Sequence, residues 1–562
     1  MSVDLVSDPS YFPTDMSRFL SFLAVVLLFS GCASPQEPVV DIPIIPMPVS
    51  MESRSGSFDL ATSSGFKVDS PELIGVTERF AATLALPMGM TLPISEDGDM
   101  VLTLDASLKK EAYTIDVSED ALVISAGNAA GAFYAFQSIL QMLPPEIEVR
   151  GRVEQGDWTI PAVHIEDAPR FSYRGMHLDV GRYFFDVAFI KKYIDTMARY
   201  KFNTFHWGLT QDQGWRLEIP AYPRLTEVGA WRKETIVDKN FDPYVGDGIP
   251  HGGFYTHDDV REVLAYAAER YVTVIPEINM PGHSTAALAA YPELGCGFGP
   301  YEVQTTWGIK SDILCPSEAT FSFLTDVLGV VIDLFPSAYI HIGSDEVPKT
   351  QWENSSLAQS IMTREGLANE EELQSWFVRR IETFLNENDR NLIGWDEILE
   401  GGLAPNATVM SWRGMVGGIE AAKMGHDVIM TPTRYAYFDF YQADPESEPL
   451  AMNWAGYSTP LDTVYAFEPV PSELTQEEAQ HILGAQGNVW TEYISTPEYA
   501  EYMVYPRAMA LAEVVWSPPA RRNLDSFYRR LVGNLPHLES LGVNYRIPDR
   551  LAGAEEEIAA LN

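Results

Sequence analysis

A repeated unit of short apolar strand, polar loop and amphipathic helix runs from about residue 170 to beyond residue 500. Parallel strands covered by helices produce this alternation, because both faces of such a sheet are buried. Helices are predicted over 188–200, 260–269, 371–386 and 498–511. Eight segments have the composition of buried strands, at 175–178, 204–207, 272–275, 339–342, 392–394, 409–411, 428–430 and 482–485. Eight such units predict an α/β fold with a (β/α)8 barrel of the TIM-barrel type.

A smaller region with a different pattern precedes the barrel. Short β-like runs alternate with turns, and a helix predicted over 129–142 is ended by Pro144-Pro145. At 562 residues the chain is also longer than one hydrophobic core usually supports. We therefore expect a small α/β domain over 40–165, the barrel over 166–520 and a C-terminal helical segment over 521–562 that packs on the barrel.

The N-terminus has the pattern of an export signal. Arg18 precedes the apolar run 19–29, which is followed by the small-residue ending Ser-Gly-Cys at 30–32. The run is too short to span a bilayer comfortably, and its charged start and small-residue end are typical of a signal peptide. No later segment has the length and apolarity of a membrane helix.

The Ser-Gly-Cys ending resembles a bacterial lipobox. In that interpretation residues 1–32 are the export signal, Cys32 is lipidated and 33–39 form a short tether; an ordinary signal peptide with an incidental cysteine is the alternative. Translation starts at Met1 or at Met16. We expect an exported protein that is lipid-anchored at the bacterial periplasm or outer membrane and has no other contact with a membrane.

The charge and the cysteines narrow the class of ligand. The formal net charge of -41 at pH 7 repels polyphosphates, which argues against a nucleic-acid partner. Apart from Cys32, only Cys296 and Cys315 are present; they form either a disulfide, in an oxidising compartment, or two buried thiols. Their spacing is not that of metal ligands, so no metal site is expected.

Ionisable and aromatic residues gather where the predicted strands end, and a barrel places its functional site at that mouth. Flat rings stack on sugar faces, whereas carboxylates and arginine bind hydroxyl groups. The sequence offers no cysteine nucleophile and no dense cluster of histidines, so it indicates an oligosaccharide or glycan as the ligand. The residues concerned are Arg174, Asp212, His283, Asp345, Glu346, Trp395, Asp396, Glu397, Trp412, Tyr437, Asp439, Trp490 and Glu492.

Asp345 and Glu346 are adjacent in the sequence. Most glycosidases use two separated carboxyl groups that flank one bond. The side chains of neighbouring residues diverge and are poorly placed for that arrangement. If both residues act, they have different roles.

Several motifs together resemble one family. The segment His341-Ile342-Gly343-Ser344-Asp345-Glu346 is similar to the His-x-Gly-Gly-Asp-Glu signature of family 20 glycoside hydrolases, the β-N-acetylhexosaminidases. Further similar motifs lie in order at 206–207, 212–215, 281–283, 394–397, 437–439 and 487–492. The resemblance covers the chain from about residue 40 onward and includes a small domain before the barrel.

The resemblance implies substrate-assisted catalysis, an exception to the scheme with two carboxylates. Glu346 would be the general acid and later the base that activates water. The acetamido oxygen of the substrate would attack the anomeric carbon and form an oxazolinium intermediate, with net retention. Asp345 would hold the acetamido N–H, and Tyr437 would donate to the carbonyl oxygen. No metal or organic cofactor is implied.

The resemblance also assigns the rest of the pocket. Trp395, Trp412 and Trp490 would wall it, and Arg174, Asp439 and Glu492 would grip the outer hydroxyls of a terminal sugar. His283, with Asp212, Gln211 and Asn279 around it, would tune Glu346. The implied activity is exo-acting release of terminal β-linked N-acetylglucosamine or N-acetylgalactosamine. Alternatives are a narrower enzyme that releases a disaccharide or a sulfated sugar, and a catalytically idle sugar-binding lipoprotein.

Four positions depart from the family pattern. Gly208 replaces a histidine, Gln211 and Asn279 replace acidic residues, and Ser344 replaces a glycine. Because Gln211 and Asn279 do not ionise, we hypothesise that His283 is less readily protonated and that the basic limb of the activity profile moves toward acid. Gly208 is expected to leave room beside the pocket for a bulkier or substituted sugar, or else to be a structural change without a functional effect.

Overall fold

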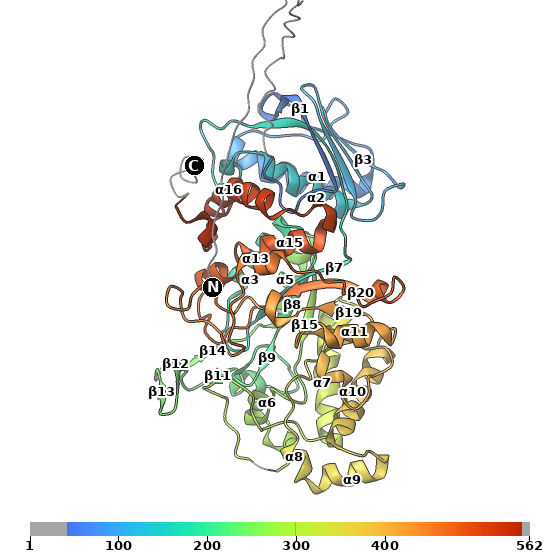
Figure 1. Cartoon of the computed structure of the whole chain (residues 1–562), viewed down its shortest axis with the longest axis vertical. Coiled ribbons are helices and arrows are strands. Elements are labelled where there is room, and N and C mark those ends of the chain that lie inside the picture. Colours follow the sequence, from blue (N-terminus) through green and yellow to red (C-terminus); the bar gives the residue numbers. More distant parts are fainter. Residues whose placement is uncertain (1–41, 298, 554–562) are drawn as a thin grey trace, which may run out of the picture. The chain divides into compact units, whose positions relative to one another are not determined.

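The computed structural model of the chain describes residues 42–297 and 299–553 (Figure 1). The predicted signal, the tether and Cys32 lie outside the described residues. Two layered regions follow one another along the chain, a mixed sheet with helices and then a barrel.

The first region is built on a six-stranded sheet of order β1-β6-β4-β5-β3-β2. Helix α2 begins after Asn128, whose side chain accepts a hydrogen bond from the Gly131 N–H, and it has the predicted bounds. Apolar residues of the helices and of one sheet face form a separate core. The elements are β1 (Ser50–Asp59), β2 (Phe66–Val68), α1 (Pro71–Met88), β3 (Met100–Leu104), β4 (Tyr113–Val117), β5 (Leu122–Ala126), α2 (Ala129–Met142) and β6 (Thr159–Asp167).

The second region is a closed barrel of eight parallel strands, in the order β15-β16-β17-β18-β19-β20-β7-β8. Each of the eight predicted strands is present, so the predicted TIM barrel is confirmed. The strands are almost entirely buried, as expected when helices cover the outside and side chains fill the inside. They are β7 (Tyr173–Asp179), β8 (Thr204–Gly208), β15 (Thr273–Glu277), β16 (Tyr339–His341), β17 (Asn391–Trp395), β18 (Thr408–Ser411), β19 (Val428–Met430) and β20 (Ile482–Gly487).

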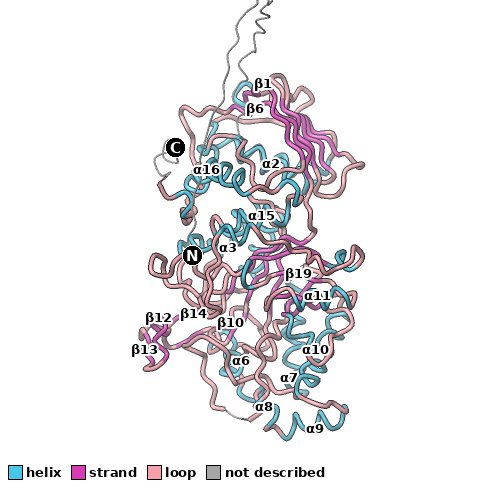
Figure 2. The backbone as a smooth tube through the Cα atoms, in the orientation of Figure 1, coloured by secondary structure: helices cyan, strands magenta, loops and turns pink. Residues whose placement is uncertain are grey.

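Helices cover the barrel, and Figure 2 shows α7, α10 and α11 in cyan beside its strands. Five of them, α3, α5, α7, α9 and α10, begin after a residue whose side chain caps the first turn, such as Asp186 before α3 and Thr256 before α5. The helices are α3 (Val187–Arg199), α4 (Arg224–Glu227), α5 (His257–Ala268), α6 (Thr285–Ala290), α7 (Glu318–Leu334), α8 (Thr350–Glu353), α9 (Ser356–Glu365), α10 (Glu370–Glu387), α11 (Val416–Lys423), α12 (Thr433–Ala436) and α13 (Leu461–Tyr465).

One predicted helix was wrong in extent. The segment predicted as a single helix over 498–511 forms α14 (Pro497–Val504) and α15 (Arg507–Trp516), with extended backbone at Tyr505. Pro506 has no N–H to donate and disfavours helical backbone in the residue before it, so the helix stops and restarts. After α15 comes α16 (Leu524–Ser540), whose Arg530 pairs with Glu513 of α15.

The long loop after β8 carries short hairpins. It contains β9 (Thr210–Gln211), β10 (Gly214–Trp215), β11 (Trp231–Arg232), β12 (Ile236–Phe241), β13 (Tyr244–Gly246) and β14 (His251–Gly252). Strands β9 and β10 form an antiparallel pair just beyond the end of β8. This loop therefore builds one side of the barrel mouth.

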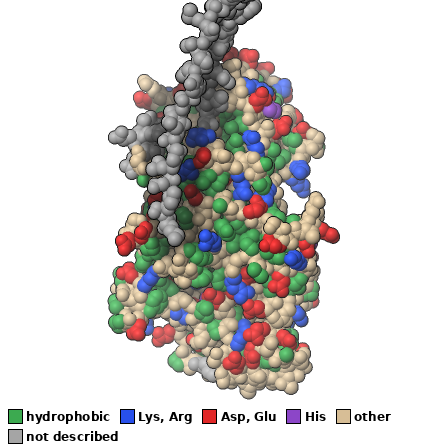
Figure 3. All heavy atoms as spheres, viewed as in Figure 1, with side chains coloured by type: hydrophobic (Ala, Val, Ile, Leu, Met, Phe, Trp, Pro, Cys, Tyr) green, Lys and Arg blue, Asp and Glu red, His purple; other side chains and the backbone are tan. Residues whose placement is uncertain are grey.

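One face of the described residues is drawn in Figure 3 with its side chains coloured by type. On the uncovered part of the face in Figure 3, acidic and basic side chains are interspersed and form no basic patch. Within residues 42–297 and 299–553, the helices are either too short or too polar to cross a bilayer.

Candidate active site

The adjacent carboxylates lie on a loop after β16 with unusual backbone. Gly343, Ser344 and Glu346 have φ angles of 67°, 70° and 49°, in the left-handed region. A side chain at Gly343 would place its Cβ 2.1 Å from Asn279 Oδ1, so only glycine fits there. Such backbone costs about 1–3 kcal/mol per residue and persists where the surroundings enforce it.

Asn279 is the residue that enforces this loop. Its Nδ2 donates to Asp345 Oδ1 at 2.8 Å, and its Oδ1 accepts from the Ser344 N–H at 3.2 Å. From the other side Gln374 donates to the Ser344 carbonyl and hydroxyl oxygens. An amide has both the donor and the acceptor that the loop needs, so Asn279 fixes the orientation of Asp345.

His283 connects the two catalytic carboxylates to a third one. Its Nδ1 lies 2.8 Å from Asp212 Oδ2, and its Nε2 lies 3.3 Å from Glu346 Oε2 and 3.5 Å from Asp345 Oδ2. Asp212 also accepts the Thr285 N–H at 3.0 Å, which orients its carboxylate. The predicted contact between His283 and Glu346 is therefore present.

Three carboxylates surround His283 and set the charge of this network. Burial alone would lower the pKa of His283, but the carboxylates of Asp345, Asp212 and Glu346 outweigh it and raise this pKa well above its usual range. The protonated form of His283 is thus favoured, and the lower proton affinity relative to family members with acidic residues at positions 211 and 279 stays a prediction. Burial raises the pKa of Asp345 to about 6, and the repulsion from Glu346 adds to this effect, while His283 and Asn279 oppose it.

Two of the sequence departures have other surroundings than expected. Gln211 is buried in β9, against Gly181, and no hydrogen bond within the described residues joins it to His283. Gly208 leaves no room beside the pocket, because a Cβ there would lie 3.0 Å from His177 Nε2. The imidazole of His177 has taken the space.

Aromatic rings form the walls above the carboxylates. Trp395 and Trp490 adjoin with centroids 5.6 Å apart and tilted rings, and Trp412 stacks on Tyr437 at 6.1 Å. The Trp412 indole N–H donates to Glu397 Oε2 at 2.9 Å. Burial, followed by the charge of Asp439, raises the pKa of Tyr437 well above 10, so its hydroxyl stays protonated and can donate.

One pole of the pocket offers polar atoms to a ligand. Arg182 is held by Asp179 at 3.0 Å and lies 3.4 Å from Glu492 Oε1. Asp439 Oδ1 and Glu492 Oε2 are buried and have no hydrogen-bond partner among the described residues. Buried acceptors are nearly always satisfied, so these two oxygens are suited to hydroxyl groups of a bound sugar.

Arg174 does not belong to this site, and its predicted role was wrong. It lies near the N-terminal end of β7, at the opposite end of the barrel from the pocket. Its guanidinium is fully buried and pairs with Glu111 of the first region at 3.0 Å. Arg182, which follows β7, occupies the place that the sequence analysis gave to Arg174.

The structure brings most of the other predicted residues together. Arg182, Met452 and Trp454 were missed. The last two lie between β19 and β20, in a part of the loop beyond the motif at 437–439, and Trp454 was a detectable signal as a tryptophan outside any predicted core element. The pocket is lined by Arg182, His283, Asp345, Glu346, Trp395, Trp412, Tyr437, Asp439, Met452, Trp454, Trp490 and Glu492.

A disulfide closes the loop next to this site. Cys296 and Cys315 are bonded, which confirms the first of the two predicted possibilities. Between them Gln304 donates to the Asp212 carbonyl, and Thr306 accepts from the Gln213 side chain. The loop therefore covers the residues that hold His283.

Within the part of the chain that the structure describes, two groups of side chains have the atoms to hold a metal ion. One is His283 with Asp345 and Glu346, and the other is His177 with His206 and Glu277. In the first group the raised pKa of His283 favours a proton between the carboxylates, and a protonated imidazole is no ligand. The histidines of the second group come from neighbouring strands, so the cluster that was not apparent in the sequence exists in the fold.

A (β/α)8 barrel with an acid pair, an aromatic-walled pocket and unsatisfied acceptors at its mouth defines a glycoside hydrolase. The chain belongs to glycosyl hydrolase family 20: residues 171–519 match its catalytic domain, and residues 41–168 match its domain 2.

Curated relatives and solved structures agree with this assignment. The chain is 44% identical to the β-hexosaminidase of Porphyromonas gingivalis, over 92% of this chain and 66% of that one. It is 31% identical to the β-N-acetylhexosaminidase of Cellulomonas fimi, over 90% and 96%. The exo-β-N-acetylglucosaminidase of Vibrio harveyi, solved with N-acetylglucosamine, has a TM-score of 0.82 at 34% identity, over 91% and 79%. The chain thus spans about two thirds of the length of the first relative.

Proposed function

We propose that the protein is an exo-acting β-N-acetylhexosaminidase that removes terminal β-linked N-acetylglucosamine or N-acetylgalactosamine from oligosaccharides. The observation that carries this proposal is the division between Asp345 and Glu346. Asp345 is buried and fixed by Asn279, whereas the Glu346 side chain is about one third exposed, at 32%. A buried carboxylate suits a fixed contact with an acetamido N–H, and an accessible one suits proton exchange with the leaving group and water.

The chemical steps follow from this division. Glu346 gives its proton to the glycosidic oxygen while the acetamido oxygen bonds to the anomeric carbon and the glycosidic bond breaks. The positive charge that develops on the acetamido group lies beside Asp345, and Tyr437 donates to its oxygen. Glu346 then takes a proton from water as that water attacks the anomeric carbon. The attack opens the oxazolinium ring, and Glu346 is again a protonated acid.

The pocket favours an unsubstituted terminal sugar. Asp439 and Glu492 are both buried at the pole that would receive the outer hydroxyls, and Arg182 is already paired with Asp179. A sulfate group there would meet two carboxylates with little free positive charge, so the sulfated-sugar alternative is disfavoured. A disaccharide-releasing enzyme remains a second possible outcome of a substrate panel.

The test is turnover of paired chromogenic substrates by the purified protein. We expect rapid release from 4-nitrophenyl β-N-acetylglucosaminide and almost none from the matching β-glucoside, because the glucoside lacks the internal nucleophile. Efficient cleavage of the glucoside would contradict the mechanism. Binding of N-acetylglucosamine without any turnover would instead support an idle sugar-binding protein.

We also propose, from the sequence at 19–32, that the protein is exported and lipid-anchored through Cys32. We expect Cys32→Ser to move the protein from the membrane fraction to the soluble fraction of a bacterial host. A variant that stays with the membrane would contradict the anchor.

A further inference from the structure

A buried carboxylate inside the barrel contacts the floor of the pocket. Glu277 ends β15 and is completely inaccessible to solvent. Its Oε1 accepts the indole N–H of Trp395 at 3.0 Å. Trp395 lines the pocket, so Glu277 holds a residue of the pocket wall, although Glu277 does not line the pocket itself.

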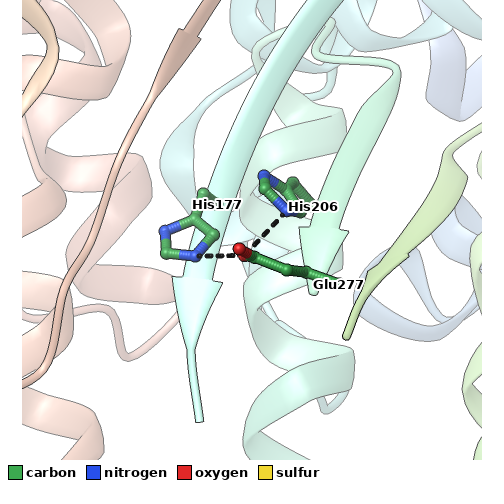
Figure 4. A group of neighbouring side chains, drawn as sticks. All are labelled: His177, His206 and Glu277. Atoms are coloured by element: carbon green, nitrogen blue, oxygen red, sulfur yellow. Dashed lines mark ion pairs between the residues drawn. The ribbon is translucent and has the colours of Figure 1, made fainter. Parts of the chain in front are cut away.

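Two imidazoles point at the second oxygen of this carboxylate, as Figure 4 shows. His206 Nε2 lies 3.1 Å from Glu277 Oε2, and His177 Nε2 lies 3.9 Å from it. Like Glu277, both histidines are fully buried. A carboxylate without such neighbours would be very costly to keep ionised in this place.

The tautomer that its neighbours favour for His206 argues against a metal site. Gln486 accepts the Tyr173 hydroxyl and donates from Nε2 to Asn488, so its Nε2 also faces His206 Nδ1 as a donor, at 3.1 Å. His206 then carries its proton on Nε2, the nitrogen that faces Glu277. A protonated nitrogen donates a hydrogen bond and does not bind a metal ion.

The carboxylate stays charged in this setting. Burial would raise the pKa of Glu277, but its interactions with His341 and His206 hold this pKa well below the usual range. A charged acceptor forms a stronger hydrogen bond than a neutral one, which restricts the indole ring more tightly.

The same cluster also contacts a second residue of the pocket wall. The His177 ring lies 4.5 Å from the ring of Trp490, which adjoins the ring of Trp395 at 5.6 Å. His177 can stand there because position 208 is glycine, since the Cβ of any other residue would lie 3.0 Å from the His177 Nε2 and crowd it. One buried cluster thus contacts two neighbouring tryptophans of the pocket wall.

We propose that Glu277, fixed by His206 and His177, is a positioning residue that holds Trp395 and thereby sets the size of the N-acetyl compartment. This inference rests on the proposed function, since it assigns to the acyl group of the substrate the part of the pocket that the adjoining rings of Trp395 and Trp490 line. Its consequence is selectivity: the compartment accepts an acetyl group and discriminates against a longer acyl chain.

The test compares two substrates that differ by one methylene, the 4-nitrophenyl glycosides of N-acetyl- and N-propionyl-glucosamine. One methylene in a tight pocket changes kcat/KM roughly 10–200-fold. We expect the natural protein to prefer the acetyl substrate by a factor in this range. In Glu277→Gln, which keeps the shape but loses the charge, the preference should fall about tenfold or more.

The control is Glu513→Gln, which removes the charge of another fully buried carboxylate, paired with Arg530 at 2.7 Å and not part of the pocket. It should be destabilised as well but keep the acetyl preference. An unchanged preference in Glu277→Gln, or an equal loss in Glu513→Gln, would overturn the inference. So would one equivalent of tightly bound metal in the purified natural protein, lost in Glu277→Gln. Failure of the natural protein to cleave the acetyl substrate would instead refute the proposed function.

Discussion

Arg174 and Arg182 are eight positions apart, near the start and just after the end of β7, and they have different roles. Arg174 stands at the start of β7, where it is buried against Glu111 and Tyr134 of the first region. Arg182 stands just past the end of β7, beside Trp490 and Glu492 in the pocket. Both arginines are almost fully buried and ion-paired, so neither burial nor charge explains their different roles.

Strand direction is what distinguishes the two arginines. In a parallel barrel all strands end at the same mouth, so residues that follow strands meet in the site, and residues that begin strands meet at the opposite end. The N-terminal end of this barrel is used for contact with the first region, and the C-terminal end is used for chemistry. Substitutions at each end of the barrel test this division of roles.

The largest effect is expected from Glu346→Gln at the mouth. Removal of the general acid should lower kcat by roughly 10²–10⁴-fold while the protein stays folded, because proton transfer contributes about that factor. Exposed Glu353→Gln on α8 is the matched control and should keep full activity. Steady-state kinetics measures both. A loss below tenfold would move the acid role to another residue.

The pair Arg182→Met and Arg174→Met tests the two ends directly. Each breaks a buried ion pair, so each should lower the free energy of unfolding by ~3–5 kcal/mol. Only Arg182→Met should also lower kcat/KM of the folded protein, by roughly 10–100-fold, since a charged hydrogen bond is worth about 1.5–3 kcal/mol. Denaturant unfolding and active-site-normalised kinetics give the two quantities. Equal losses of kcat/KM would refute the division between the ends.

Asn279→Asp should move the acid limb of the activity profile. Asp345 must be ionised to accept the acetamido N–H, and its pKa is about 6, so kcat/KM should fall as pH decreases through about 6. A second carboxyl group at position 279 replaces a donor by a negative charge and raises the pKa of Asp345 further. The acid limb should therefore move to higher pH. A limb at the same pH in both proteins would show that another group controls it.

The smallest effect is expected from Gly208→Ala, inside the barrel. Its added methyl group crowds His177 and should cost about 1–3 kcal/mol of stability through overpacking. Urea unfolding measures this cost. Because His177 already fills the space beside Gly208, the natural and variant proteins should accept the same range of sugars. If the natural protein cleaved sugars with bulky substituents and the variant did not, free space beside Gly208 would be indicated.

The barrel was predictable from the sequence because each strand is a short apolar run that is buried on both sides. Segments such as 428–430 and 409–411 lack any alternation, which is the pattern of strands covered by helices. The break at Pro506 was also present as a signal, since proline ends helices, but the apolar periodicity on both sides concealed it.

The site was predictable only where a motif marks a strand end. Asp345, Glu346 and Tyr437 follow recognisable strands, whereas Trp454 lies in a long irregular loop. The cluster of His177, His206 and Glu277 comes from three strands that are adjacent only in the closed barrel. Lateral proximity of this kind is set by strand order and register, which no local pattern contains.

The left-handed backbone of the loop after β16 has a consequence for attempts to engineer this protein. A stabilisation scheme that considers backbone strain alone would replace Ser344 and Glu346 with glycine, because φ is 70° and 49° at these positions. At Ser344 the substitution removes only the hydrogen bond between the hydroxyl group and Gln374, so it is a reasonable way to raise stability. At Glu346 the same substitution would raise stability but remove the proton donor. The strained backbone at Glu346 must therefore be kept for activity.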